Sequence, residues 1–286
     1  MHPDVEIIAL QARGLEGRPV ANHHHGLIGE TDLAFTASVD YTKCDVLFVC
    51  PGSLGAADFM RLRTERPELK IIMLEPISGV DLEKAGAVYG LPEINRKLLV
   101  RGAPVAVIPT SLASMALVAL FPLAKNLLLS GDIEIDVTAP EAILESLDLA
   151  KTAEEIRGQL AEVQQSFSGT VRIASKDSQS RRSALMNIDL QCGVGLEALL
   201  GLYDLYDDHR FAFVTTMPVG VSEVAGTNKC VITVGKPESG RTELGVAADC
   251  RLRGASGEAV HVMNLMFGLH EKTGLALKAI DFSPIE

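Results

Sequence analysis

The sequence contains no tryptophan among its 286 residues, and aromatic residues make up only 5% of the chain. Stacking on nucleic-acid bases depends on such rings, so this mode of recognition is not expected. Basic residues are also few, since 26 lysines and arginines against 37 acidic residues give a net charge of −11. Because a phosphate backbone is bound by a basic surface, we expect no nucleic-acid partner.

Long hydrophobic runs and cysteine motifs are missing as well. The longest apolar stretch, residues 115–124, is far shorter than the roughly 20 residues of a membrane-spanning helix. The first residues lack the pattern of a signal peptide. The five cysteines form no CxxC motif and no even-numbered framework, which is typical of reduced thiols. We therefore predict a cytoplasmic protein with no membrane partner.

The first third of the chain alternates short apolar runs with amphipathic segments. The expected strands are residues 5–10, 44–50, 70–74 and 104–108. Residues 60–68 are expected to form a helix, and residues 111–129 a long buried one. Short apolar strands separated by helices indicate a parallel sheet that is covered on both faces.

The second half has a different pattern. The expected strands are residues 133–137, 169–174, 184–190, 211–214, 229–234 and 243–247. Helices are expected at residues 152–165, 196–206 and 256–267. Strands that follow one another with few helices between them favour an α+β arrangement with a mostly antiparallel sheet.

Two glycine-containing loops are candidates for binding an anion, because each precedes a helix whose first amides could face a phosphate. The first loop follows the strand at 44–50, and the second precedes the last helix. The candidate binding residues are Pro51, Gly52, Ser53, Gly254, Ala255 and Gly257. Neither loop has the full GxGxxG pattern, and a tight turn with Ser256 as a helix cap explains the second loop equally well.

Nucleophiles and metal ligands give weaker signals. Ser111 follows a strand and begins a helix, but no histidine lies within twenty residues of it, so a base would have to come from elsewhere in the fold. Cys50 also ends a strand, and we interpret it as a core residue. The adjacent histidines 23–25 cannot all point at one ion, and we predict no metal site.

Several spaced motifs together resemble the N-acetyl-gamma-glutamyl-phosphate reductase family. Residues 88–96 (VYGLPEINR), 105–112 (VAVIPTSL) and 119–125 (ALFPLAK) resemble its Y-G-L-P-E, A-N-P-G-C-Y-P-T and L-x-P-L blocks at the same spacing. Near the end, residues 226–230 (GTNKC) and 254–269 resemble its G-T-N and K-G-A-A-G-Q-A-V-Q-N-M-N-L-M-F-G blocks. The resemblance covers essentially the whole chain.

The resemblance implies a two-domain α/β protein of the semialdehyde dehydrogenase type. It implies a Rossmann-like domain that holds NADP and a glyceraldehyde-phosphate-dehydrogenase-like α+β domain that carries the active site and the oligomer interface. It also implies a reaction of arginine biosynthesis, in which a cysteine thiolate displaces phosphate from an acyl phosphate and hydride from NADPH reduces the thioester.

This sequence departs from the family pattern where the chemistry would occur. Ungapped alignment places the nucleophilic cysteine at Ser111 and its flanking asparagine and glycine at Ile108 and Thr110. The H-R-H-x-P-E-I block, which supplies the catalytic histidine, appears only as residues 150–156 (AKTAEEI). The D-L-S-A-D-F-R block becomes residues 74–79, the S-G-A-G stretch is missing, and the asparagine of D-N-L-x-K falls on Cys250.

The sequence also departs from the family pattern at the cofactor site. Residues 2–7 (HPDVEI) resemble the second strand of the family, so the first strand, its glycine-rich phosphate loop and the following helix are not expected in this chain. Since that strand is central in the family's sheet, its loss would leave strand edges unpaired.

We therefore predict a Rossmann-like parallel-sheet domain at residues 1–110 and 255–286, with the first βα unit absent, and an α+β domain at residues 111–254. The leading hypothesis is an inactive homologue of the reductase with a regulatory, assembly or ligand-binding role, in which Ser111 is not a working nucleophile. Its expected partners are another copy of itself, an intact homologue or an acyl-amino-acid-like ligand. The alternatives are a working NADPH-dependent reductase and an unrelated chemistry on the same fold.

Overall fold

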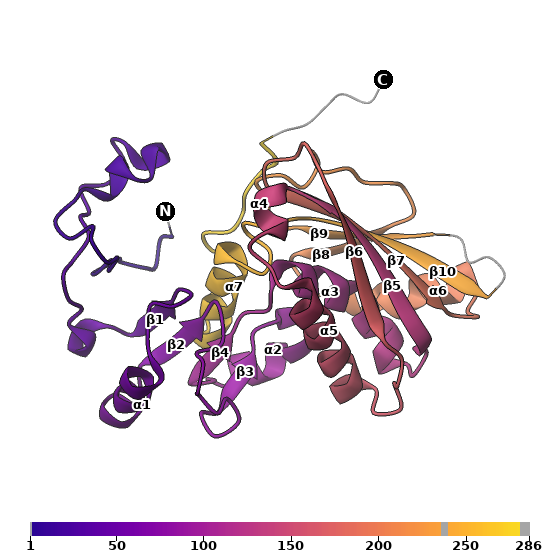
Figure 1. The fold of residues 1–286 in the computed structure, drawn as a ribbon, viewed down its shortest axis with the longest axis horizontal. Helices are drawn as coiled ribbons and strands as arrows, with labels where there is room; N and C mark the ends of the chain where they lie inside the picture. Colours follow the sequence, from indigo (N-terminus) through magenta and orange to yellow (C-terminus); the bar gives the residue numbers. More distant parts are fainter. Residues whose placement is uncertain (1, 236–239, 281–286) are drawn as a thin grey trace.

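A computed structural model describes residues 2–235 and 240–280 of the chain. Four of its strands form a parallel sheet, drawn on the left of Figure 1. They are β1 (Val46–Val49), β2 (Lys70–Met73), β3 (Ala87–Tyr89) and β4 (Val105–Val107), in the order β1-β2-β4-β3. The sheet is therefore parallel, as the short apolar runs predict.

Helices pack on both faces of this sheet. Phe59 of α1 (Ala56–Glu65) lies in one apolar cluster with Ile71 and Val105. On the other face, Ile72 and Ala106 pack with residues of α7 (Ser256–Met266), which is drawn in yellow beside β2 and β4 in Figure 1. The helix α2 (Pro92–Val100) contributes Leu99 to the same cluster. The last helix thus returns to the first sheet.

Six further strands form a mixed sheet in the order β6-β5-β7-β10-β9-β8. Its three central pairings are antiparallel, and the pairings β5–β6 and β8–β9 at its two edges are parallel. The prediction of a mostly antiparallel sheet is confirmed. The strands are β5 (Ser130–Ala139), β6 (Val171–Asp177), β7 (Ser183–Gln191), β8 (Ala212–Thr215), β9 (Cys230–Val234) and β10 (Arg241–Asp249).

The largest apolar cluster lies between this sheet and two long helices, α3 (Ser111–Lys125) and α5 (Leu149–Val163). Nearly every residue of α3 is buried, because it packs against α5 and the sheet at once. Side chains of β5 alternate between exposed and buried, so the sheet presents its second face to solvent. The short helices are α4 (Glu141–Leu144), α6 (Leu196–Leu202) and the 3-10 helix η4 (Tyr203–Tyr206).

The N-terminal segment contradicts one prediction. Residues 5–10 form no strand within the described chain, and the N-terminal segment contains two isolated bridges, Gln11 with Thr36 and Pro19 with Ala34. Ile7 and Ile8 remain about half exposed. An apolar run becomes a strand only beside a partner strand, and β1, the edge of the described sheet, pairs with β2 alone. The 3-10 helices in this region are η1 (Val20–Asn22), η2 (His25–Leu27) and η3 (Tyr41–Lys43).

Smaller differences concern element ends. The first helix begins at Ala56 rather than at residue 60, and α3 ends at Lys125 rather than at residue 129. Leu127 has φ +59°, a left-handed conformation that a continuing helix does not allow. The division into residues 1–110 with 255–286 and residues 111–254 stays a proposal, supported by the separate apolar clusters of the two sheets.

Candidate functional site

The start of α3 lies at the carboxyl end of β4, where open parallel sheets usually bind their ligands. Thr110 caps the helix, because its Oγ1 accepts a hydrogen bond from the Ala113 amide at 3.4 Å. The same hydroxyl donates to Glu155 Oε2 of α5 at 2.8 Å. The other oxygen of Glu155 accepts from the Tyr89 hydroxyl at 2.8 Å. Glu155 therefore holds Thr110, the residue before Ser111, in place, and Tyr89 in turn orients the carboxylate of Glu155.

Ser111 itself is enclosed, with 6% of its surface exposed. Gly254, at φ +62°, lies directly against it: a Cβ atom added to Gly254 would stand 2.3 Å from Ser111 Cα. Burial raises the pKa of the nearby Cys250 thiol to about 12, although the side chain of Ser111 opposes this shift. The group beside Ser111 is thus a protonated thiol rather than a base.

The loop at residues 254–257 uses its own amides internally. Gly254 N donates to Glu258 Oε2 at 2.6 Å, Ala255 N donates to Leu252 O at 3.3 Å, and Glu258 N donates to the same carbonyl at 3.0 Å. The sequence predicts that the amides of this loop can bind an anion. These hydrogen bonds leave few amides for such a role.

Gly257 faces protein as well. A Cβ atom added there would stand 1.8 Å from Asn228 Oδ1, so the glycine allows the loop before β9 to approach α7. The close approaches at residues 254 and 257 explain the two glycines without a ligand.

The loop at residues 51–53 stands apart, two strands from β4 in the sheet order. Pro51 has no amide hydrogen, and Ser53 N donates to Cys50 O at 3.0 Å. Gly52, at φ +67°, is exposed, and a Cβ atom added to it would meet no atom within 4 Å. Cys50 is exposed rather than part of the core, because it follows the end of β1.

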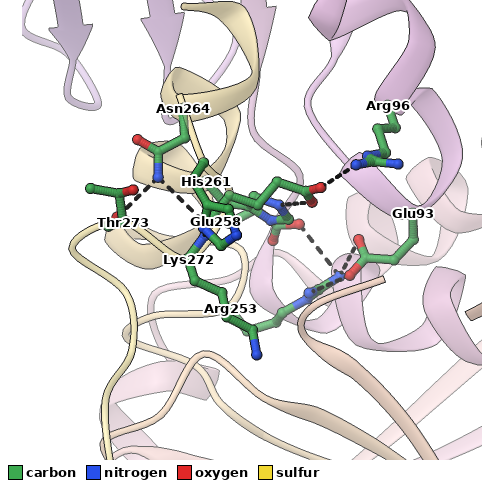
Figure 2. A network of polar contacts seen from close by, with 10 residues as sticks. Glu93, Arg96, Arg253, Glu258, His261, Asn264, Lys272 and Thr273 are labelled. Atoms are coloured by element: carbon green, nitrogen blue, oxygen red, sulfur yellow. Dashed lines mark hydrogen bonds and ion pairs between the residues drawn. The ribbon is translucent and has the colours of Figure 1, made fainter. Parts of the chain in front are cut away.

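A buried ion cluster joins α2, α3 and α7 (Figure 2). Arg253 donates to both oxygens of Glu93 at 2.9 and 2.8 Å, and its Nε donates to Ser114 Oγ at 2.7 Å. The hydroxyl of Ser114 in turn donates to Glu258 Oε2 at 2.8 Å. Burial opposes the charge of Glu93, but the guanidinium outweighs it and lowers the pKa of Glu93 to about 2.

A second group of polar contacts continues along α7. His261 Nε2 lies 2.9 Å from Glu271 Oε2, and Glu271 also pairs with Arg96 of α2. Asn264 donates to backbone carbonyls of the C-terminal loop, and its Oδ1 lies 2.9 Å from His2 Nε2. In Figure 2, His261 points from α7 toward the side of Arg96, whereas Asn264 lies on the side of Thr273.

Sequence reasoning missed these two clusters and Glu155. Glu93 and Arg253 of the first cluster are 160 positions apart, so no local spacing reveals them. One signal is available: Glu258 and His261 stand on the apolar face of a helix, where charged side chains need buried partners.

The described residues were also searched for a metal site and for a membrane-spanning helix. In residues 2–235 and 240–280, no group of histidine, cysteine and acidic side chains is placed to hold a metal ion. No described helix is long and apolar enough to cross a membrane.

The comparisons with known proteins agree with the motif resemblance, although no family model matches the chain. Two curated relatives are named N-acetyl-gamma-glutamyl-phosphate reductase. The relative from Phocaeicola vulgatus is 32% identical over 302 residues, covering 98% of this chain and 93% of the relative. The relative from Parabacteroides distasonis is 30% identical over 301 residues with the same coverage.

Solved structures of semialdehyde dehydrogenases share the fold. Aspartate semialdehyde dehydrogenase II from Vibrio cholerae has a TM-score of 0.61 and 14% identity, with 82% of each chain covered. A probable aspartate-semialdehyde dehydrogenase from Pseudomonas aeruginosa has a TM-score of 0.58 and 15% identity, covering 83% of this chain and 84% of that one. The predicted fold class, a Rossmann-like part joined to a glyceraldehyde-phosphate-dehydrogenase-like α+β part, is confirmed.

Proposed function

The chain belongs to the N-acetyl-gamma-glutamyl-phosphate reductase family, and we propose that it has lost the covalent catalysis of that family. In this proposal it acts as a regulatory, assembly or ligand-binding protein. The observation that carries the proposal is the setting of Ser111, the residue at the family's cysteine position.

Acyl transfer to an enzyme needs a nucleophile that is activated by a base or by a lowered pKa. Ser111 is enclosed under Gly254, and the titratable group near its side chain is the Cys250 thiol. Cys250 cannot replace the missing nucleophile as a thiolate, because burial raises the pKa of its thiol to about 12. Both side chains therefore remain protonated at neutral pH, which supports an inactive centre.

The two candidate loops do not fit a dinucleotide well. A pyrophosphate rests on several free amides at the start of a helix. At residues 254–258, three amides already donate to protein oxygens. At residues 51–53, only the Gly52 amide is left to face an anion, since Pro51 has none and Ser53 donates to Cys50. This count supports weak NADP binding by the chain, and we derive no reaction step through the cofactor.

A working NADPH-dependent reductase is the second candidate. It is favoured by the alignment with reductases over 98% of the chain. It requires another nucleophile, and the thiol of Cys250, whose pKa the side chain of Ser111 affects, is the candidate near the family position.

A protein without catalysis needs a partner or a ligand. We propose self-association, or association with an intact homologue, through the uncovered face of the six-stranded sheet. A groove of about 360 Å³ lies on this face, lined by side chains that point away from α3 and α5, among them Asp136, Asn187 and Glu243. An acyl-amino-acid-like ligand is the remaining possibility that this proposal includes.

Growth of a bacterium whose own reductase gene is deleted tests the proposal. We expect no growth without arginine when this chain is expressed, and growth when the Parabacteroides distasonis relative is expressed as a control. Expression of both proteins must be verified by immunoblot. Growth supported by this chain would contradict the proposal and favour the second candidate.

A further inference from the structure

A small cavity lies between the first turns of α7 and the loop before β9. The volume that the centre of a water-sized molecule can occupy is about 10 Å³. The polar residues that line the cavity are Asn228, Arg253, Glu258 and His261. A buried water needs roughly 10–15 Å³ and two to four polar partners. The cavity therefore has the size of a single water molecule.

Two oxygen atoms at this cavity are buried without a hydrogen-bond partner in the described chain, Asn228 Oδ1 and Glu258 Oε1. The other polar atoms of these side chains are paired. Asn228 Nδ2 donates to Leu275 O at 3.1 Å, and Glu258 Oε2 accepts from Gly254 N and Ser114 Oγ at 2.6 and 2.8 Å. Since buried polar atoms are nearly always hydrogen-bonded, two unpaired oxygens around one cavity indicate a shared ligand.

Glu258 shares its cation, Arg253, with Glu93. Arg253 gives two hydrogen bonds to Glu93, whereas its nearest nitrogen to Glu258 Oε1 is 3.5 Å away. The other arginine of the region, Arg96, pairs with Glu271, which also contacts His261. The groups that face Glu258 from α2, the loop before α7 and α7 itself thus supply one guanidinium for two buried carboxyl groups.

The hydrogen bonds also show which oxygen of Glu258 can carry a proton. Oε2 accepts from an amide and a hydroxyl, so a proton on that atom would clash with both donors. Oε1 is buried and accepts none in the described chain, and Glu258 is one of the residues that line the cavity. Burial raises the pKa of Glu258, although Arg253 opposes this effect.

We propose that the cavity binds one water molecule between Glu258 and Asn228, and that Glu258 is the neutral acid that donates its proton to this water through Oε1. The water then donates to Asn228 Oδ1. This bridge fastens the loop before β9 to the helix turn that holds Gly254 against Ser111, and it does so without an unpaired buried charge.

Unfolding experiments on Glu258→Gln test the neutral acid. The carbonyl oxygen of glutamine can accept the hydrogen bonds from Gly254 N and Ser114 Oγ, and its amide nitrogen can donate to the water. Glutamine is also neutral at every pH. Because the pKa of Glu258 is raised on folding, the protonated form stabilises the wild type fully below pH 4.5, and this stability is lost as the pH rises through the raised pKa. The control is Glu197→Gln, an exposed residue in the first turn of α6.

The ratio of the unfolding constants, wild type over Glu258→Gln, should rise as the pH increases above 4.5, by up to about tenfold per pH unit, until the pH passes the raised pKa of Glu258. The same ratio for Glu197→Gln should stay constant. Parallel profiles for wild type and Glu258→Gln would overturn the proposal.

A second measurement uses the unmodified protein, so it does not depend on the variant folding. A crystal structure at a resolution that shows ordered water should contain one peak within about 2.6–3.2 Å of both Asn228 Oδ1 and Glu258 Oε1. Growth of the crystals in rubidium chloride distinguishes water from a monovalent cation. No peak, or a rubidium signal in the cavity, would overturn the proposal.

Discussion

Gly254 lies over Ser111 so closely that a Cβ atom on the glycine would stand 2.3 Å from Ser111 Cα. This contact closes the start of α3, the place where the family resemblance puts its nucleophile. It joins two residues that are 143 positions apart in the sequence (254 − 111 = 143). The glycine is required both for this approach and for its positive φ of +62°.

We predict that Gly254→Ala strongly destabilises the protein. A left-handed conformation alone costs an alanine about 1–2 kcal/mol, and the clash with Ser111 adds to that cost. Gly14→Ala is the matched control, because Gly14 has φ +78° but no atom within 4 Å of an added Cβ. Urea unfolding should show a loss for Gly254→Ala at least twice that of Gly14→Ala. Equal losses would mean that the loop can move away from Ser111.

We predict that Glu93→Gln lowers the free energy of unfolding by about 3–5 kcal/mol, since it leaves the buried Arg253 without its carboxylate. The exposed pair of Arg157 and Glu154 offers the control, and Glu154→Gln should cost less than about 1 kcal/mol. Denaturant unfolding at pH 7 measures both variants.

The same pair predicts the response to acid. Because the pKa of Glu93 is lowered to about 2, the ionised form stabilises the fold above pH 4.5, and this stability is lost as the pH falls towards 2. The wild type should therefore lose its advantage over Glu93→Gln in that window. An advantage that persists at pH 2 would contradict the assigned ion pair.

We predict that Ser111→Cys alone restores little reductase activity, below about one hundredth of the turnover of an active relative. The new thiol would lie under Gly254 and near a second protonated thiol, Cys250, which is not a base. Turnover with N-acetyl-gamma-glutamyl phosphate measures the outcome, with the Phocaeicola vulgatus relative as a positive control. A large gain would show that the remaining site is intact.

We predict that NADPH binds this chain with a dissociation constant above about 1 mM, which corresponds to less than about 4 kcal/mol. Only the Gly52 amide remains to face a phosphate at residues 51–53, and three amides of residues 254–258 are already paired. Calorimetric titration decides the matter, with an established NADPH-dependent dehydrogenase as the control. Micromolar binding would reveal a phosphate site elsewhere in the chain.

Much of the fold could be predicted from the sequence because its strongest signals are local. The apolar run before Pro109 and the apolar segment that begins at Ser111 place β4 and the start of α3 correctly, and strict alternation identifies β5. The strand β3 was missed because it is three residues long and only half buried. Residues 5–10 have a strand pattern, but a strand also needs a neighbour, which the pattern does not contain.

The site was predicted less completely for a physical reason. Ser111 and the loop at 254–257 were singled out, and the structure brings them together. The pairing of Glu93 with Arg253 and the contact of Ser111 with Cys250 depend on tertiary packing between segments more than a hundred positions apart. Sequence spacing carries no information about such contacts, so the chemistry beside Ser111 follows only from the fold.

The reductase assay tests the central claim most directly. The purified chain is mixed with N-acetyl-gamma-glutamyl phosphate and NADPH, and the oxidation of NADPH is followed by absorbance beside a heat-inactivated sample and an active relative. Because Ser111 and Cys250 both stay protonated, we predict a rate equal to that of the heat-inactivated sample. A rate well above that sample would contradict the claim that this chain has lost covalent catalysis.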